Sequence, residues 1–538
     1  MSLTDALFTG TSGLRALGHG MGVVGDNVAN LNTTAFKGSR ISFSDMMAQS
    51  INTAAGSGQL GRGTTLQALY PIFTQGSFES TANPTDLAIA GNGFFVVRDP
   101  RTTGNVFYTR DGQFTIDKNG YLVNAAGLRV QGWKIDEDTG DITGVITDIQ
   151  IDRSSPPVKT SLIDVITNLN AEAERNKNID TTGDSPDVTF NPDSITDNNT
   201  DNKVTLWGKW DANKDTPLET TDYDYRTSLY IYDSLGTPHE ITIYYKAANL
   251  ITSDGTTPVY EFLVTCDPEE DMRSPIDDTS KKGVLMYGML EFDTQGNVKN
   301  FLNVYRYGWD AGGDQYQLVR IVDDSGTPQT PNDAFADSTY FTTTIGALGT
   351  NGYPIFIADF LGIEVAPDGN EDAAATKNLQ PIELNFGYYY DESWRSETVR
   401  TTQYSAPFAT LFYDQNGFGP GTLESIAVDN EGRITGYYSN GRVIPLWMVA
   451  LANFNAPERL QKVGGNLYKE TTYSGPPVTG KPGTNGLGTI APNSIEQSNV
   501  DLAEQFVKMI IFQRGFQADA RIITVSDGML EELINLKR

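Results

Sequence analysis

The side chains in this sequence that could carry chemistry are few and far apart. The 538 residues include two histidines, His19 and His239, and a single cysteine, Cys266. One cysteine excludes an intramolecular disulfide and a multi-cysteine zinc site, and two distant histidines offer little for a catalytic triad or a histidine-rich metal site. We assign neither histidine a ligand role. We therefore predict no catalytic, cofactor-binding or metal-binding residues.

Two stretches imitate ligand-binding motifs without completing them. Asp211, Asn213 and Asp215 have the first ligand spacings of a calcium loop, but Thr216 stands where that loop requires glycine. Residues 91–95 read Gly-Asn-Gly-Phe-Phe, yet neither a third glycine nor a Lys-Ser/Thr pair follows, as a phosphate loop would need. We interpret the first as a surface loop and the second as a tight turn before a buried strand.

The lone cysteine has a simple structural interpretation. Cys266 shares one face of a predicted strand with Tyr260, Phe262 and Val264, because alternate residues of a strand point to the same side. This pattern predicts a buried, inert thiol. A covalent link to another subunit is the alternative.

Composition narrows the class of protein. Lys and Arg number 39 against 68 Asp and Glu, a net charge of −29, and no basic stretch could neutralise a row of phosphates. We therefore expect no nucleic-acid partner. Glycine (53), proline (25) and tyrosine (25) are abundant, and hydrophobic residues make up 38%, which is typical of a turn-rich β protein. No run of about 18 apolar residues predicts a membrane span, and glycines interrupt the N-terminal region where a cleavable signal peptide would need an apolar core.

Both ends of the chain carry the apolar spacing of helices that pair. At the N-terminus the spacing alternates between four and three, which predicts the seam of a helix meeting another helix. Glycines within this segment weaken the helix, because each costs about 0.5–1 kcal/mol relative to alanine. The C-terminal segment repeats the spacing, and Ser498 with Asp501 resembles a capping box at its start. The predicted seam residues are Leu3, Leu7, Leu14, Leu17, Met21, Val24, Val28 and Leu31 at one end, and Leu502, Phe506, Met509, Phe516, Ile523 and Leu530 at the other.

Between these ends the pattern is one of strands and turns. Residues 114–123, 290–298 and 426–434 each place an Asp-x-x-Gly turn between two apolar runs, which predicts β-hairpins. Residues 229–245 predict a fourth hairpin. The expected fold is mainly β, with nested sandwich-like or barrel-like β domains and terminal helices that pair in a coiled-coil-like core.

Composition also suggests the domain boundaries. We expect an N-terminal core helix at 1–32, a connecting segment at 33–70, and the first half of an inner β domain at 71–154. An inserted outer β part follows at 155–385, then the second half of the inner domain at 386–473. A Gly- and Pro-rich linker at 474–497 precedes a C-terminal core helix at 498–538.

Several motifs resemble those of flagellar rod and hook proteins. The strongest is residues 27–38, Asn-Val-Ala-Asn-Leu-Asn-Thr-Thr-Ala-Phe-Lys-Gly, which is similar to the N-terminal signature of that family and contains Asn27, Asn30, Asn32 and Phe36. Residues 91–97, 109–114 and 128–133 are further matches, and residues 494–503 and 515–521 resemble the C-terminal signature. Within this family, the length and the large insert favour a hook protein over a rod protein.

The resemblance implies a function and a set of partners. It implies a subunit, not an enzyme, that polymerises into a curved hollow tube and acts as a universal joint between rod and filament. Implied partners are copies of the chain, the rod, the hook cap and hook–filament junction proteins, and the flagellar type III export apparatus, which would export the chain without a cleavable signal. It also implies the alternative for Cys266, since spirochaete hook proteins join a modified cysteine to a neighbour's lysine. A rod or hook-associated axial protein, and an adhesin or secreted enzyme, are the competing interpretations.

Overall fold

The structure of this chain is a computed structural model. It describes all residues except 1–2, 48, 54–55, 103, 138, 176–177, 181–204, 253–254, 275, 277, 311–314, 324, 330–345, 365–375, 378 and 537–538. The chain divides into two compact units, which we call the terminal unit (Met1–Ser154 with Thr422–Arg538) and the central unit (Ser155–Gly421). The central unit is thus an insertion within the terminal unit.

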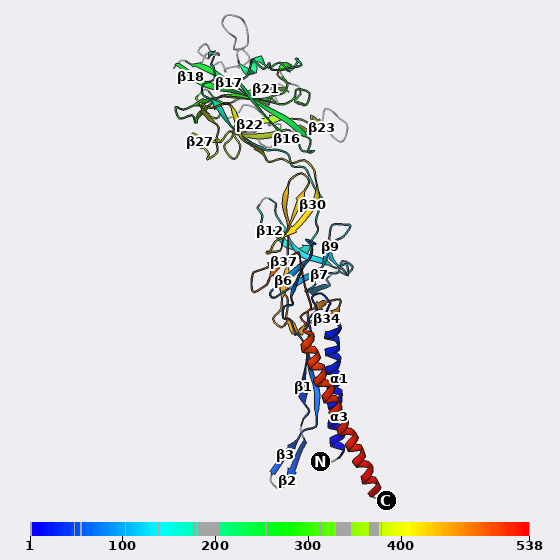
Figure 1. The fold of residues 1–538 in the computed structure, drawn as a ribbon. Helices are drawn as coiled ribbons and strands as arrows, with labels where there is room; N and C mark the ends of the chain where they lie inside the picture. Colours follow the sequence, from blue (N-terminus) through cyan, green and yellow to red (C-terminus); the bar gives the residue numbers. More distant parts are fainter. Residues whose placement is uncertain are drawn as a thin grey trace. The chain divides into compact units, whose positions relative to one another are not determined.

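The terminal unit combines a β body with two long helices (Figure 1). Helix α1 (Leu3–Ala29) and helix α3 (Leu502–Leu536) run side by side, and the β body is built from both ends of the chain. Its strands are β1 (Ser39–Asp45), β2 (Gln49–Thr53), β3 (Gly56–Leu60), β4 (Thr64–Pro71), β5 (Phe78–Ser80), β6 (Leu87–Ala90), β7 (Phe94–Arg98), β8 (Val106–Thr109), β9 (Phe114–Ile116), β10 (Leu122–Asn124), β11 (Arg129–Ile135), β12 (Ile142–Asp148), β13 (Ser154–Ser155), β30 (Gly421–Val428), β31 (Arg433–Tyr438), β32 (Val443–Val449), β33 (Leu451–Asn453), β34 (Gln461–Gly464), β35 (Leu467–Lys469), β36 (Val478–Gly480), β37 (Thr489–Pro492) and β38 (Ser494–Glu496).

The two halves of the terminal unit are joined by strand pairing. The main sheet runs β13-β30-β31-β32-β11-β7-β8-β35-β34, so it contains groups of strands from both before and after the insertion. Its core contains Phe95 and Val130 from the first half and Val449 and Leu451 from the second. Neither half can bury these side chains alone, so the two chain segments must fold together.

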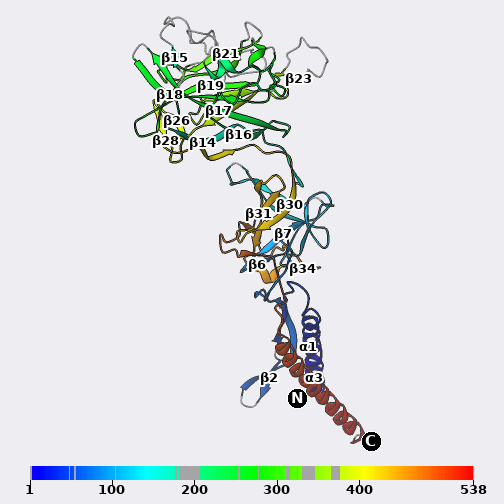
Figure 2. The ribbon, with the colours of Figure 1, turned by 45° about the horizontal axis from the view of Figure 1, so that its top comes forward.

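The central unit is a β-sandwich (Figure 2), and the larger of its two sheets has a second hydrophobic core on its outer face. A five-stranded sheet, β22-β25-β14-β28 with β29 beside β14, packs against a seven-stranded sheet, β15-β17-β18-β19-β20-β21 with β16 beside β17. The other face of the larger sheet is covered by the short helix α2 (Leu206–Lys209), whose Trp207 packs on Tyr287 and Tyr307. The strands are β14 (Leu162–Asn170), β15 (Asn178–Asp180), β16 (Tyr225–Tyr232), β17 (Pro238–Thr252), β18 (Gly255–Thr265), β19 (Val284–Phe292), β20 (Val298–Asp310), β21 (Gln315–Val322), β22 (Ile355–Ala358), β23 (Ile363–Glu364), β24 (Thr376–Lys377), β25 (Gln380–Asn385), β26 (Tyr388–Tyr390), β27 (Trp394–Ser396), β28 (Thr402–Tyr404) and β29 (Ala409–Gln415).

The four predicted hairpins are confirmed. Strands β9 and β10, β16 and β17, β19 and β20, and β30 and β31 pair as antiparallel neighbours. In each turn the Asp side chain accepts hydrogen bonds from the amides two and four residues ahead, as Asp293 does from Gln295 and Asn297. The closing Gly296 has a φ of +80°, which favours glycine. The mainly β fold with paired terminal helices is confirmed as well.

Two predicted boundaries are wrong. Residues 386–421, assigned to the inner β domain, belong to the central unit, because β28 and β29 pair with β14 at the start of the insertion. The predicted linker at 474–497 is not a free linker, since β36, β37 and β38 pair with β33, β6 and β5. Its prolines and glycines occupy turns between short strands, which composition alone does not distinguish from a linker.

Candidate functional site

The two terminal helices approach each other along a line of glycines on α1. A Cβ atom built at Gly10 would lie 3.0 Å from Ile523 Cγ1, and one at Gly20 would lie 3.0 Å from Phe512 Cε2. At Gly13 it would lie 2.1 Å from the Asp519 carboxylate, so no other residue fits there without movement. Small residues therefore bring the antiparallel helices close, in place of the interlocking large side chains of a coiled coil.

This contact includes two residues of the predicted seam, since Ile523 lies against Gly10 and Leu17 lies against Gly515. Of the predicted α1 seam, Val24 is buried; Leu7, Leu14, Leu17, Met21, Val28 and Leu31 are half-buried, and the side chain of Leu3 lies outside the described residues. On α3, Met509, Ile523 and Leu530 are half-buried, whereas Leu502, Phe506 and Phe516 are exposed. The apolar stripes are present, but the pairing within one chain covers them only in part.

Helix α3 also carries many exposed apolar side chains outside the predicted stripe. The exposed fraction reaches 59% at Ile511, 61% at Val525 and 87% at Leu536. Others of this kind are Val507, Ile510, Ile522, Met529 and Leu533. Exposed apolar side chains gathered on one helix in this way are typical of a protein–protein contact.

The β1–β4 hairpin braces the helix pair on one side. Strand β1 pairs with β4, with a bulge between Ser42 and Phe43. Phe43 contacts Phe512 of α3 edge to face, with ring centroids 6.2 Å apart. The amide of Thr64 donates to Ser12 Oγ of α1 at 3.2 Å. The hairpin thus touches both helices and holds their relative position.

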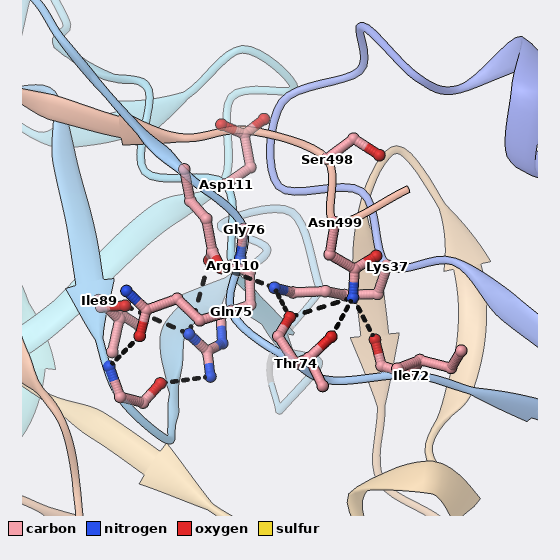
Figure 3. A network of polar contacts seen from close by, with 12 residues as sticks. Lys37, Ile72, Thr74, Gln75, Gly76, Ile89, Arg110, Asp111, Ser498 and Asn499 are labelled. Atoms are coloured by element: carbon pink, nitrogen blue, oxygen red, sulfur yellow. Dashed lines mark hydrogen bonds and ion pairs between the residues drawn. The ribbon is translucent and has the colours of Figure 1, made fainter. Parts of the chain in front are cut away.

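A buried charge network lies where the helices join the β body (Figure 3). Lys37 Nζ donates to Glu496 Oε1 at 2.6 Å and to the carbonyl of Thr74 at 2.8 Å. Arg110 Nη1 lies 3.5 Å from Glu496 Oε2, and the amide of Gly76 donates to Glu496 Oε1 at 2.9 Å. Both Lys37 and Glu496 side chains are fully buried. Burial lowers the pKa of Lys37 and of Arg110, while the Glu496 carboxylate opposes both shifts.

Asn499 completes this junction with uncharged hydrogen bonds. Its side-chain amide donates to the carbonyls of Ile72 and Thr74, and its Oδ1 accepts from the amide of Gly38 at 2.9 Å. Figure 3 shows Asn499 reaching across to the segment that holds Ile72 and Thr74. The N-terminal motif, the segment after β4 and the C-terminal segment are therefore tied at one place.

The asparagines of the family motif have distinct roles. Asn27 exchanges two hydrogen bonds with the backbone of Ser39, both at 2.9 Å, and donates to Gln505 Oε1 of α3 at 3.1 Å. Asn30 donates to the carbonyl of Asp26 and ends α1. Asn32 is exposed, and Phe36 lies half-buried beneath the Lys462 ammonium, 5.1 Å from its ring centroid.

The start of α3 differs from the predicted capping box. The α3 cap is Asp501, whose Oδ1 accepts from the amides of Ala503 and Glu504, whereas Ser498 bonds the amide of Val500 outside the helix. The predicted capping box with Ser498 as the cap is therefore wrong by three residues, because Asp501 serves as the cap itself.

The candidate reactive or ligand-binding residues of the central unit make structural contacts within it. Cys266 is 4% exposed, and burial, followed by the nearby Asp271, raises the pKa of its thiol. His239 stacks on Phe360 and contacts Glu270 and Asp233 through its two ring nitrogens. Asp211 accepts from the backbone and side-chain amides of Asn213. In the terminal unit, the predicted tight turn at Gly91 and Gly93 is confirmed by φ values of +113° and +127°.

Sequence reasoning missed the residues that make the junction. Lys37, Arg110 and Glu496 lie within or beside the motifs that were singled out, but no role was assigned to them. The available signal was the presence of charged residues within motifs made mostly of apolar and small residues. Such charges are expected to be buried and paired, since a buried charge needs a partner. The glycines of α1 were interpreted mainly as a weakness of the helix, although Gly10, Gly13 and Gly20 lie at its contact with α3.

Comparison with known proteins places these features in a family. Residues 199–418 match the model of the flagellar basal body protein FlaE D2 domain, residues 88–170 the flagellar hook protein FlgE/F/G D1 domain, and residues 491–536 the flagellar basal body rod FlgEFG protein C-terminal region. The flagellar hook protein FlgE of Borreliella burgdorferi is 30% identical, and that of Treponema pallidum 29%, each over 99% of both chains. A solved structure, the Helicobacter pylori flagellar hook protein FlgE2, covers 78% of this chain and 100% of its own at 14% identity, with a TM-score of 0.41. No helix among the described residues is long and apolar enough to cross a membrane.

Proposed function

The chain belongs to the flagellar hook protein family and is a structural subunit of the hook, and from this premise we propose that its copies polymerise through the paired terminal helices. The observation that carries the proposal is the apolar surface that α1 and α3 leave uncovered after pairing with each other. Burying such surface stabilises association by about 25 cal/mol per Å² before the costs of association.

The polymer that we propose is a curved hollow tube that links rod and filament as a universal joint. A heterologous contact between copies generates a helical assembly when its repetition does not close into a ring. The terminal helices supply such a contact, because the apolar face of α3 differs from the half-buried stripe of α1. In this assembly the remaining seam residues of both helices contact neighbouring copies.

We also propose the wider setting of the subunit. The rod, the hook cap and the hook–filament junction proteins are the expected neighbours at the ends of the tube, and the flagellar export apparatus is the expected route to it. A structural role without catalysis fits the packing, since Cys266 is buried and His239 is held between two carboxylates. The hook role is favoured over a rod role because the hook relatives match 99% of both chains, insertion included.

Electron microscopy of the purified chain at high concentration and salt tests the proposal. Full-length chain should form tubes, and a version lacking residues 1–32 and 498–538 should not. Ile511→Glu, which places a charge on the exposed face of α3, should reduce assembly strongly, whereas Val145→Glu on an exposed strand of the terminal unit should not. Tubes from the truncated chain, or equal loss in both point variants, would refute assembly through the helices.

A further inference from the structure

Glu496 is a single buried carboxylate that holds together segments far apart in the sequence. Its Oε1 accepts from Lys37 Nζ at 2.6 Å and from the amide of Gly76 at 2.9 Å, and its Oε2 lies 3.5 Å from Arg110 Nη1. The side chains of Glu496 and Lys37 are fully buried, and that of Arg110 is 3% exposed. Removing one member of such a group leaves a buried charge without compensation, which is strongly destabilising.

The backbone of Glu496 also imposes an unfavourable conformation on the N-terminal motif. The amide of Ala35 donates to the Glu496 carbonyl at 2.7 Å, and Ala35 has a φ of +56° although it is not a glycine. This left-handed conformation is disfavoured for residues with a Cβ atom. The hydrogen bond to the C-terminal segment therefore helps to hold the N-terminal motif in this conformation.

Hydrogen bonds continue from this junction into the two helices. Ser39, two residues after Lys37, is held by Asn27 near the end of α1, and Asn27 donates to Gln505 in the first turn of α3. Beyond this contact the helices meet at Gly20 with Phe512, then at Gly13 with Asp519. The junction is thus the fixed end of the helix pair, and the register of every later contact follows from it.

We propose that Glu496 is a positioning residue for hook assembly, which closes the junction between the two chain ends and so sets the register in which α1 and α3 present their assembly face. The inference rests on the proposed assembly through the terminal helices. It goes beyond that function because it makes the ordering of one chain end conditional on the arrival of the other. A subunit with an open junction would be folded in its β body and unable to add to the tube.

The test compares Glu496→Gln with Glu79→Gln in the full-length chain. Glu79 is a matched control, because it is exposed at the same junction and accepts from Gln497 Nε2 at 3.0 Å. Amide hydrogen exchange on the unassembled chain should show loss of protection at Ala35, Gly38 and Gly76 in Glu496→Gln. Protection in β7 should stay unchanged, and the concentration needed for tubes should rise at least about tenfold. Glu79→Gln should behave like the unmodified chain.

Relief of the backbone strain supplies a second readout. Ala35→Gly should raise protection at Gly38 in the full-length chain and restore part of the assembly lost in Glu496→Gln, because glycine adopts a positive φ without a Cβ clash. A role confined to general stability would not be rescued at this position.

Each remaining outcome decides against one proposal or the other. Normal exchange and normal tubes in Glu496→Gln overturn the positioning role, as does an equal loss of protection in β7. If Glu496→Gln fails to fold, a lack of effect of Ala35→Gly alone on protection overturns it. Tubes from the chain without its terminal helices would instead overturn the proposed function, on which the positioning role depends.

Discussion

Cys266 shows how burial settles the chemistry of a single residue. It follows β18, its amide donates to the carbonyl of Gly283 at 2.8 Å, and it is 4% exposed. Burial, followed by the charge of Asp271, raises the pKa of the thiol well above its ordinary value of 9.0. The thiolate is the reactive form of cysteine. In the folded central unit, burial therefore makes Cys266 unreactive, because it both blocks reagents and disfavours the thiolate.

We therefore expect native chain to resist thiol reagents at pH 8. Alkylation of Cys266 should be at least about 100-fold slower than in denaturant, since the residue reacts only after local opening. The contribution of the thiol to stability should be present below about pH 9 and lost above it, because the unfolded thiol then ionises while the folded one keeps its proton. Mass spectrometry of alkylation time courses measures the rate. Comparable rates in folded and denatured protein would show that Cys266 is accessible, as a covalent link to another subunit requires.

At the scale of the element, the terminal helices show that apolar spacing predicts a helix but not which of its faces contacts its partner. The four-three spacing predicted two terminal helices that pair, and the structure contains them. It did not predict that α1 meets α3 through Gly10, Gly13 and Gly20, because small residues at regular intervals look like defects in an apolar pattern. Which stripe is buried depends on how closely two backbones approach, and a single sequence does not contain that distance.

The glycines of α1 divide into two classes with opposite expected effects on substitution. A Cβ atom at Gly18 meets nothing within 4 Å, so Gly18→Ala should stabilise the helix by about 0.5–1 kcal/mol through the lower entropy of the unfolded chain. Gly20→Leu should weaken helix pairing and assembly, because its side chain collides with Phe512. Circular dichroism melts and tube yields measure the two effects. If Gly20→Leu assembled as well as Gly18→Ala, the glycine contact would not be needed in the tube.

Among the strands, too, features set by neighbouring residues were predicted, whereas pairings between distant segments were not. Asp-x-x-Gly turns are local, and all four predicted hairpins were found. A further turn of this kind, in which Asp323 accepts from the amides of Ser325 and Thr327, was not singled out. The strands of residues 474–497 were missed because each is short, and because β37 and β38 pair with β6 and β5, which lie hundreds of residues earlier. Such pairings leave no periodic signal in the segment itself.

At the scale of the whole molecule, charge is divided unevenly between the two units. The central unit, residues 155–421, contains 42 Asp and Glu against 17 Lys and Arg, whereas the rest of the chain contains 26 against 22. The sequence supplied the net charge of −29 but located the end of the insertion at residue 385 instead of 421. That end depends on β29 pairing with β14, a contact between segments more than 200 residues apart. The acidic excess thus belongs almost entirely to the unit without the terminal helices.

This distribution leads us to expect that salt promotes assembly. Polymerisation raises the local concentration of strongly acidic central units, and their repulsion is screened as the Debye length falls from about 30 Å at 0.01 M to about 10 Å at 0.1 M salt. The contact between apolar helix faces carries no such penalty and should persist or strengthen. Sedimentation across a sodium chloride series should therefore show the critical concentration for tubes falling as salt rises. A triple variant of exposed central-unit acids, Asp215→Asn with Glu219→Gln and Glu240→Gln, should lower the critical concentration at low salt. It should also make the critical concentration depend less on salt. A matched triple variant of the terminal unit, Glu424→Gln with Glu431→Gln and Glu458→Gln, should change the critical concentration and its salt dependence less. Assembly that weakens steadily as salt is added would instead mean that ion pairs between copies, and not their apolar helix faces, hold the tube together.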